Sequence, residues 1–141
     1  MTDNNTPLVS VIVPVYNVAP YVERCAKSLF EQTLKDIEII FVDDCSPDNS
    51  IDLVKNLANN YPDRLAQIKY VRHEHNRGLA QARKTGLDVA TGEYVAHSIR
   101  MIMFPWRCMR NYMMRQRGQS LRLYIVIFLW ITVCKKQSVV L

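Results

Sequence analysis

The chain has no aspartate or glutamate after Glu93, although thirteen acidic residues precede that point. Eight of its eighteen lysines and arginines follow Ser98. Residues 98–141 therefore carry a formal charge of +8, whereas residues 1–97, with ten bases and thirteen acids, carry −3. A folded domain with no carboxylate over forty-four residues would be unusual. The net charge of +5, which alone would suggest an anionic partner, averages two differently composed sequences.

The sequence also lacks the patterns of a metal-binding, disulfide-linked or membrane-spanning protein. Its four cysteines are widely spaced, with no CxxC or Cys/His pattern, which predicts reduced thiols in a cytosolic protein. The opening MTDNNTP has neither the basic start nor the apolar run of a secretion signal. The apolar stretch Leu123–Val133 has eleven residues, whereas a spanning helix needs about 20. We expect one domain, preceded by a disordered segment at residues 1–6.

Residues 7–97 alternate between apolar runs typical of buried strands and patterns typical of helices. Strands are predicted at Val9–Val15, Ile37–Val42 and Ile68–Val71, since near-continuous apolar runs suit a sheet covered on both faces. A fourth strand begins with EYVA at Glu93 and should end just after His97. Two apolar stripes at helical spacing predict two helices. The first helix begins near Pro20, and its stripe is Val22, Cys25, Ala26, Leu29 and Phe30. The second helix is capped by Asp48, Asn49 or Ser50, and its stripe is Ile51, Val54, Leu57 and Tyr61. A third helix is predicted from Leu79 to about Ala90, with Gly92 at its end. This alternation predicts an α/β fold with a mainly parallel sheet.

Polar residues gather where these strands end, and ligands of such sheets bind beyond the carboxyl ends of the strands. The ends are Tyr16 and Asn17, then Asp43 and Asp44, then His73–Gly78, and the position just after His97. An aromatic ring can stack on a nucleobase, a carboxylate can accept a hydrogen bond from a base N–H, and Arg77 or Arg83 can balance phosphate charge. The combination predicts a nucleotide site.

Simpler interpretations of the same residues stay open. Asp43 and Asp44 can be ordinary loop residues, Tyr16 can be packing, and Arg77 and Arg83 can be solvated charges. For the segment HEHN (residues 73–76) we expect an exposed loop, because no third metal ligand is apparent. His97 is expected to be structural, Cys25 a core residue, and Cys45 a loop residue without an activating base.

The segments VSVIVPVYN, FVDDCSPDNS and NRGLAQARKTGLDVATGEYV, in this order, resemble the N-terminal half of family-2 glycosyltransferases, which have the GT-A fold. The resemblance covers roughly residues 7–97. It implies a nucleotide-sugar site: Pro14 and Tyr16 would line the base pocket, Asp44 would bind the base, usually uracil, with Asp43 beside it, and Gly78 and Arg83 would lie along the donor.

The resemblance also implies a reaction. Members of this family are inverting enzymes, in which a carboxylate base deprotonates an acceptor hydroxyl that then attacks the anomeric carbon of a nucleotide-sugar. A divalent metal, Mn or Mg, on the diphosphate stabilises the leaving group, and an Asp-x-Asp signature directly after the fourth strand holds it. Here that position reads SIRM, from Ser98 to Met101, and the acceptor half that would carry the base is missing too. No catalytic residue and no metal ligand can therefore be assigned in this chain.

The resemblance implies partners and a setting as well. The expected donor is a UDP-sugar and the expected acceptor a saccharide, in the synthesis of bacterial surface polysaccharide. The expected location is the cytoplasm, with the inner face of the membrane as an alternative. No nucleic acid partner is expected.

The composition change at Ser98 suggests a shifted reading frame. In the shifted frame, each codon consists of the last base of one present codon and the first two bases of the next. The methionine codon ends in G and every isoleucine codon begins with AT, so Met101 followed by Ile102 gives GAT, which encodes aspartate. With free codon choices, Ser98–Gln116 can be decoded as DSDDYVPLEMYEKLYDEA, which restores the acidic signature. We hypothesise a single-base deletion, or an equivalent sequencing error, near His97. Stop codons in the shifted frame of the coding DNA within the next few dozen codons would refute it.

Residues 98–141 thus have three interpretations. They are a frameshift product that forms no domain, a basic membrane-surface segment, or a nucleic-acid-binding arm. We take the first as the working hypothesis and expect a non-native or disordered tail. The whole chain is then a truncated, inactive glycosyltransferase. The alternatives are a nucleotide-binding remnant and a membrane-associated interaction fragment without catalysis.

Overall fold

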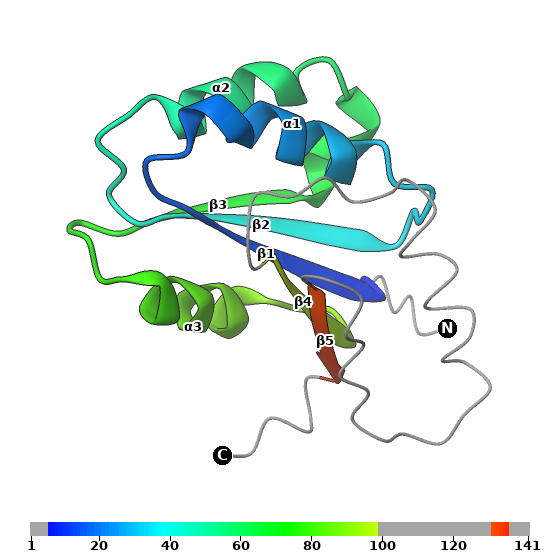
Figure 1. The fold of residues 1–141 in the computed structure, drawn as a ribbon. Coiled ribbons are helices and arrows are strands. Elements are labelled where there is room, and N and C mark those ends of the chain that lie inside the picture. Colours follow the sequence, from blue (N-terminus) through cyan, green and yellow to red (C-terminus); the bar gives the residue numbers. More distant parts are fainter. Residues whose placement is uncertain (1–5, 99–130, 136–141) are drawn as a thin grey trace.

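The computed structural model describes residues 6–98 and 131–135, which form a single sheet with helices on both faces (Figure 1). The elements are β1 (Val9–Val15), α1 (Ala19–Phe30), β2 (Ile37–Asp43), α2 (Ser50–Ala58), the 3-10 helix η1 (Pro62–Gln67), β3 (Ile68–Arg72), α3 (Leu79–Val89), β4 (Tyr94–Ser98) and β5 (Ile131–Lys135). The α/β class and the mainly parallel sheet predicted from the sequence are confirmed. Of the segment expected to be disordered, residues 1–5 lie outside the described residues.

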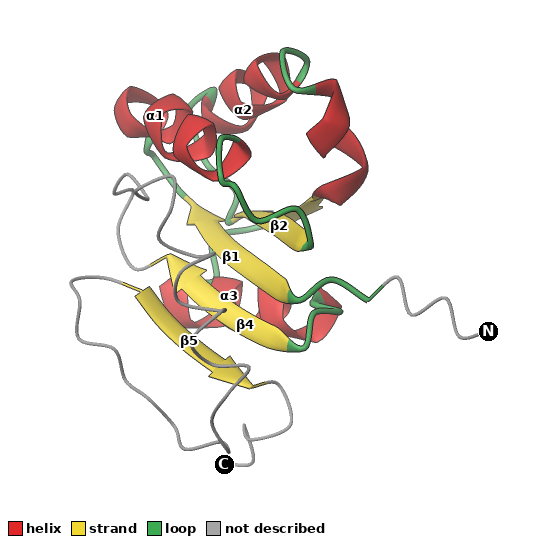
Figure 2. Ribbon diagram, turned by 90° about the vertical axis from the view of Figure 1, so that its right-hand side faces the viewer, coloured by secondary structure: helices red, strands yellow, loops and turns green. Residues whose placement is uncertain are grey.

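The strands lie in the order β3-β2-β1-β4-β5. The first four are parallel, with Val9 of β1 opposite Ile37 of β2 and Tyr94 of β4, and β5 runs antiparallel to β4. Figures 1 and 2 show α1 and α2 on one face of the sheet and α3 on the other. The carboxyl ends of all four parallel strands therefore meet at one edge, where ligands of open α/β sheets bind.

Alternate residues of the central strands supply two separate cores. Val11 and Phe41 belong to the core under α1 and α2, which also contains Leu29. Ile12 and Ile40 belong to the core under α3, which also contains Ala82. Because both faces of β1 and β2 are covered, their sequences are mostly apolar, as expected for buried parallel strands. Two buried polar residues interrupt them, and the Ser10 hydroxyl donates to Glu38 Oε2 at 2.5 Å.

The second helix is shorter than its apolar stripe predicted. It ends at Ala58, and Tyr61 lies in the turn before η1, where Pro62 cannot continue the α-helical hydrogen bonds. The tyrosine ring still packs against the core, with its centroid 5.3 Å from that of Phe30. The apolar stripe therefore predicted correctly that Tyr61 packs against the core, but it overestimated the length of α2.

Gly92 does not end a helix as predicted, because α3 ends at Val89 and Ala90 is already extended. Gly92 instead lies against β1, where its N–H donates to Ser10 Oγ at 2.8 Å. A Cβ atom at this position would lie 2.7 Å from both the backbone nitrogen and Oγ of Ser10. Glycine is required here by the close approach of two backbones.

We expect Gly92→Ala to lower the free energy of unfolding by about 1–3 kcal/mol, the range for overpacking in a core. The backbone of β1 cannot move away without disturbing its pairing with β2 and β4. Urea unfolding followed by circular dichroism measures the change. Lys84→Ala, at an exposed position of α3, is the control and is expected to stay within about 0.5 kcal/mol. Equal urea midpoints for Gly92→Ala and the wild type would contradict this account.

Arg64 of η1 is the buried arginine of the described region, with 4% of its surface exposed. Its guanidinium donates to the carbonyls of Phe30 and Leu34, each at 3.1 Å, and to that of Gln32. These carbonyls lie at the C-terminal end of α1 and in the segment after it, where helix carbonyls lack helical partners. Arg64 therefore joins the end of α1 to η1.

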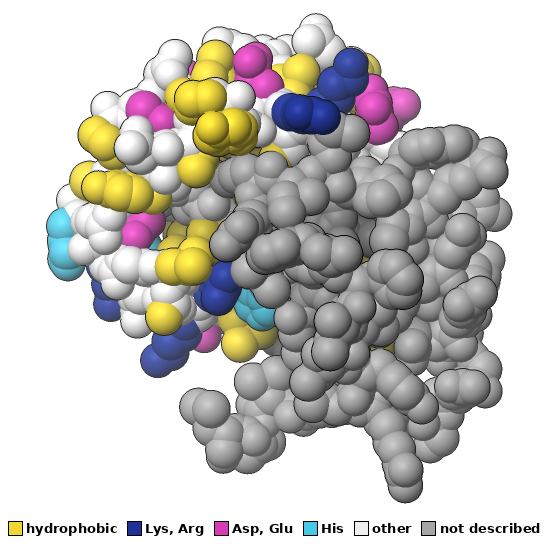
Figure 3. All heavy atoms as spheres, viewed as in Figure 1, with side chains coloured by type: hydrophobic (Ala, Val, Ile, Leu, Met, Phe, Trp, Pro, Cys, Tyr) yellow, Lys and Arg dark blue, Asp and Glu magenta, His cyan; other side chains and the backbone are white. Residues whose placement is uncertain are grey.

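Most of the tail lies outside the described residues, so its expected disorder is untested there. Within it, Ile131–Lys135 forms β5, with Lys135 opposite Tyr94. The apolar stretch Leu123–Val133 is described only over its last three residues. Among the described residues, no helix is both long and apolar enough to cross a bilayer. On the face shown in Figure 3, acidic and basic side chains of the described region are interspersed.

Candidate functional site

A cavity of about 250 Å³ opens at the carboxyl edge of the sheet. It is lined by Pro14, Val15, Tyr16, Val18, Asp44, Asn76, Gly78, Leu79, Ala82 and Ser98. The lining comes from the end of β1, the loops after β2 and β3, the start of α3 and the end of β4. The strand ends that were expected to meet do surround one space.

Of the six predicted site residues, Pro14, Tyr16, Asp44 and Gly78 line this cavity. Tyr16 keeps 47% of its surface exposed although it lines the cavity. Gly78 precedes α3 with a φ of 86°, a conformation that favours glycine. Asp43 and Arg83 are not among the lining residues.

Asp44 is held by three hydrogen bonds at the wall of the cavity. Oδ1 accepts from the backbone N–H of Arg77 at 2.8 Å and lies 2.7 Å from His73 Nδ1, and Oδ2 accepts from the backbone N–H of Gly78 at 2.8 Å. Burial disfavours the charged form, but these bonds outweigh it and lower the pKa of Asp44 below its ordinary value. Asp44 is therefore ionised at neutral pH.

The described residues leave Asp44 one acceptor position that none of them occupies. An ionised carboxylate offers about four lone-pair positions, and contacts within the described region occupy two on Oδ1 and one on Oδ2. The remaining position on Oδ2 can accept a hydrogen bond from a ligand in the cavity. This is the chemistry that recognition of a base N–H requires.

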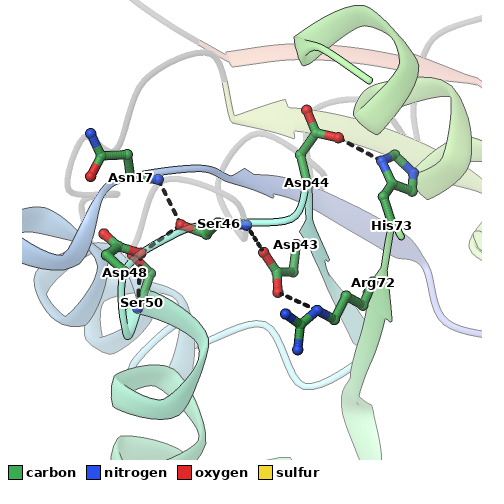
Figure 4. Close-up of polar contacts among 8 residues, drawn as sticks. All are labelled: Asn17, Asp43, Asp44, Ser46, Asp48, Ser50, Arg72 and His73. Carbon is green, nitrogen blue, oxygen red and sulfur yellow. Dashed lines mark hydrogen bonds and ion pairs between the residues drawn. The ribbon is translucent and has the colours of Figure 1, made fainter. Parts of the chain in front are cut away.

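Asp43, the residue directly before Asp44, is directed away from the cavity. The last residue of β2 lies on the α1 and α2 face, because neighbouring strand residues point to opposite faces. Its Oδ1 accepts from the backbone N–H of Ser46 at 2.8 Å, and its Oδ2 lies 3.5 Å from Arg72 Nε. Figure 4 shows the two neighbouring carboxylates pointing in opposite directions.

The HEHN loop is exposed at residues 74–76 as predicted, but the prediction is wrong for His73, of which only 6% of the surface is exposed. The register of β3 places Arg72 opposite Asp43, so the next residue comes beside Asp44. The other imidazole nitrogen, Nε2, lies 2.9 Å from Thr85 Oγ1 of α3. The position of His73 directly after a strand, like that of Asp44, was the signal that sequence reasoning overlooked.

A second group of polar residues ties the loop after β2 to the start of α1 (Figure 4). Asp48 accepts from the backbone N–H of Ala19 at 2.8 Å and from the hydroxyls of Ser46 and Ser50, both at 2.5 Å. Burial opposes ionisation, but these bonds lower the pKa of Asp48 to about 2. The Asn17 N–H donates to Ser46 Oγ at 2.8 Å. These bonds join the loop that carries Tyr16 to the loop that carries Asp44.

Arg83 of α3 and His97 of β4 are not among the residues that line the cavity. Burial and the nearby charge of Arg83 lower the pKa of His97, so the imidazole is neutral at neutral pH. Arg83 Nε and His97 Nδ1 are both buried and have no hydrogen-bond partner among the described residues. Arg77 contributes its backbone N–H to Asp44, while its side chain is exposed.

The described residues do not offer a site for a divalent metal ion. Within the described part of the chain, no three His, Cys, Asp or Glu residues come together. Mg²⁺ is usually held by one or two carboxylates together with substrate phosphates and water. Asp44 is the only carboxylate that the described residues place in the cavity wall, and three of its acceptor positions are already occupied.

The model of the family described as "Glycosyl transferase family 2" matches residues 10–97. The chain belongs to this family. The resemblance seen in the sequence is therefore confirmed, and the match of this family-2 glycosyltransferase chain ends at His97, four residues after the last acidic residue, Glu93.

Similar proteins extend well beyond the matched region. The chain is 49% identical over 89 residues to the uncharacterized glycosyltransferase EpsJ of Bacillus subtilis, and the match covers 63% of this chain and 24% of EpsJ. It is 34% identical over 92 residues to the hyaluronan synthase of Pasteurella multocida, covering 65% of this chain and 9% of that enzyme. This family-2 glycosyltransferase chain thus spans a quarter or less of these two relatives.

Two solved structures show the fold with ligands. The mannosyltransferase PcManGT from Pyrobaculum calidifontis, in complex with GDP-Man and Mn2+, superposes with a TM-score of 0.61 at 36% identity, covering 65% of this chain and 27% of that one. S. aureus TarS in complex with UDP gives a TM-score of 0.69 at 26% identity, covering 78% and 32%. Residues 6–98 thus have the fold of the N-terminal part of GT-A glycosyltransferases.

Proposed function

We propose that residues 6–98 form the donor-binding half of a glycosyltransferase that transfers a sugar from a UDP-sugar to a saccharide acceptor. The observation that carries the proposal is an ionised Asp44 with one open acceptor position in the wall of a 250 Å³ cavity. The cavity is smaller than the roughly 300–1,000 Å³ of typical whole-ligand sites. It suits a base, with the ribose and diphosphate lying along the open edge of the sheet.

Each residue of the site has a part in this proposal. Asp44 accepts the N–H of the base, and the exposed ring of Tyr16 stacks on the base, against the wall formed by Pro14. We assign to Arg83 of α3 the charge that balances the diphosphate; this assignment follows the family resemblance, because Arg83 is not among the residues that line the cavity. The bound nucleotides of similar structures, GDP-Man in one and UDP in another, support a nucleotide-sugar donor.

The proposed setting is the synthesis of a bacterial surface polysaccharide, in the cytoplasm or at the inner face of the membrane. The similar proteins support this setting. They include glycosyltransferases of Bacillus, Escherichia and Pasteurella, and one of them is a hyaluronan synthase. Intact relatives with the Asp-x-Asp signature would use Mn²⁺ or Mg²⁺, for which this chain has no described ligands.

We expect the purified 141-residue chain to bind UDP and to show no sugar transfer. Binding needs the edge of the sheet, which is present. Transfer needs a carboxylate base and metal-binding acids, and no acidic residue follows Glu93. Isothermal titration calorimetry with UDP, GDP and ADP measures binding, and release of UDP from UDP-glucose and UDP-N-acetylglucosamine measures turnover.

Two outcomes would contradict this proposal. Turnover of a UDP-sugar above that of an Asp44→Ala control would show that the chain is active. Failure of the folded chain to bind any nucleoside diphosphate would show that the cavity is not a donor site. Circular dichroism of the same sample establishes that it is folded.

A further inference from the structure

His73 joins three elements around the proposed base-binding carboxylate. Its ring lies between Asp44, after β2, and Thr85, on α3, and its own backbone N–H donates to the Asp43 carbonyl at 2.9 Å. Its side chain and that of Asp44 are about equally buried, with 5% and 4% of their surfaces exposed. A histidine so enclosed is held in one orientation by its two ring contacts.

The chemistry of these contacts fixes the direction of the hydrogen bond to Asp44. An ionised carboxylate only accepts, so Nδ1 carries a proton and donates to Asp44 Oδ1 at 2.7 Å. The other ring nitrogen, Nε2, lies 2.9 Å from Thr85 Oγ1, whose hydroxyl can both donate and accept. The chain of bonds runs from Thr85 through His73 to Asp44.

This chain determines how Asp44 faces the cavity. Without His73, Oδ1 would keep only the backbone N–H of Arg77, and the carboxylate could turn about its terminal torsion, which is broad for aspartate. With His73, Oδ1 has two donors and Oδ2 is left with Gly78 and the open position. A carboxylate fixed in this way accepts a base N–H and repels a base acceptor atom.

We propose that His73, oriented by Thr85, is a positioning residue that makes the site select bases with a ring N–H. The inference rests on the proposed donor-binding function. Uracil carries an N–H at N3, where cytosine carries an acceptor nitrogen, so UDP and CDP form a matched pair of probes. A histidine that only fills space would affect the affinity for both probes alike, whereas a positioning residue affects their ratio.

Three substitutions separate these roles. His73→Leu removes both ring bonds and keeps the bulk. His73→Asn keeps a donor near the place of Nδ1 and loses the bond to Thr85. Thr85→Val keeps the shape of the threonine and removes only its hydroxyl, so it carries the test even if His73→Leu fails to fold.

The measurement is the affinity of the full chain and each variant for UDP and CDP by calorimetry, with thermal unfolding recorded alongside. A neutral hydrogen bond contributes about 0.5–1.5 kcal/mol, which corresponds to roughly 2- to 13-fold in affinity. We expect His73→Leu to lower the UDP-to-CDP ratio by about tenfold, Thr85→Val to lower it about threefold, and His73→Asn to preserve most of it.

The outcomes distinguish this inference from the proposed function. Suppose that the wild type binds UDP and Asp44→Asn does not. If the UDP-to-CDP affinity ratio is then unchanged in His73→Leu, the positioning role is wrong and the donor site stands. Should His73→Leu not fold, an unchanged ratio in Thr85→Val leads to the same conclusion. If the folded wild type binds neither probe, the donor site is wrong and the positioning role falls with it.

Discussion

Replacing Asp44 with asparagine is expected to weaken UDP binding about 10- to 150-fold. A hydrogen bond to a charged group is worth roughly 1.5–3 kcal/mol, and the variant removes the charge that receives the base N–H. If the amide oxygen keeps the contacts of Oδ1, the amide nitrogen takes the place of Oδ2 and faces the N–H of Gly78. Two donors then meet at the position where the base should bind.

Two aspartates serve as comparisons in the same titration. Asp52→Asn, at an exposed position of α2, is the control and should leave the affinity unchanged. Asp43→Asn tests which of the neighbouring acids contacts the base, and we expect less than a threefold effect because its carboxylate bonds to Ser46 and Arg72 on the other face. A larger loss from Asp43→Asn than from Asp44→Asn would reverse our assignment.

The pKa of Asp44 sets the acid limit of the wild-type site. Its hydrogen bonds hold the folded-state pKa below the ordinary value of an aspartate. The stability gained from the ionised carboxylate is therefore fully present above that ordinary value and is lost as the pH falls through the lowered folded-state pKa. UDP affinity should therefore be nearly constant from pH 7 to pH 5. A steep fall within that range would mean that a different group controls binding.

Replacing Arg64 with methionine is expected to lower the free energy of unfolding by about 3 kcal/mol or more. The substitution leaves the carbonyls of Phe30, Gln32 and Leu34 without their donor. Each buried carbonyl that loses its partner costs about 1–3 kcal/mol. Small domains are stable by only about 5–15 kcal/mol, so a large part of the stability of this chain would be lost.

Urea unfolding of Arg64→Met beside Lys27→Met measures this effect. Lys27 is also a basic residue near the end of α1, but its side chain is 60% exposed and lies 3.9 Å from Glu31. Exposed pairs of this kind contribute about 0.3–0.5 kcal/mol, so the control should be almost neutral. Equal midpoints for the two variants would show that water replaces the guanidinium at no cost.

The sequence predicted the elements well because each leaves a local pattern. β1 runs from Val9 to Val15 as predicted, since a doubly covered strand is apolar at most positions and Ser10 is its one polar residue. The cavity residues Tyr16 and Asp44 were found for a related reason: polar side chains directly after a buried strand stand at the edge where parallel strands end together.

The parts that sequence reasoning missed depend on contacts between distant segments. His73 meets a partner 29 residues away, and Arg64 meets carbonyls 30 to 34 residues away. A polar residue with such partners looks like any surface residue in the sequence. The opposite directions of Asp43 and Asp44 were predictable in principle, because the alternation that sends Phe41 and Val42 to different cores continues to the end of the strand.

The central place of β1 has a consequence for synthesis on the ribosome. β1 is the first strand to emerge, and β2 can pair with it early, but its other neighbour, β4, begins only at Tyr94. The delay of roughly 80 residues lasts about 4–16 s at a translation rate of 5–20 residues per second. During that interval the free edge of a valine-rich strand is open to other nascent chains, so protection by a chaperone matters most before the sheet is complete.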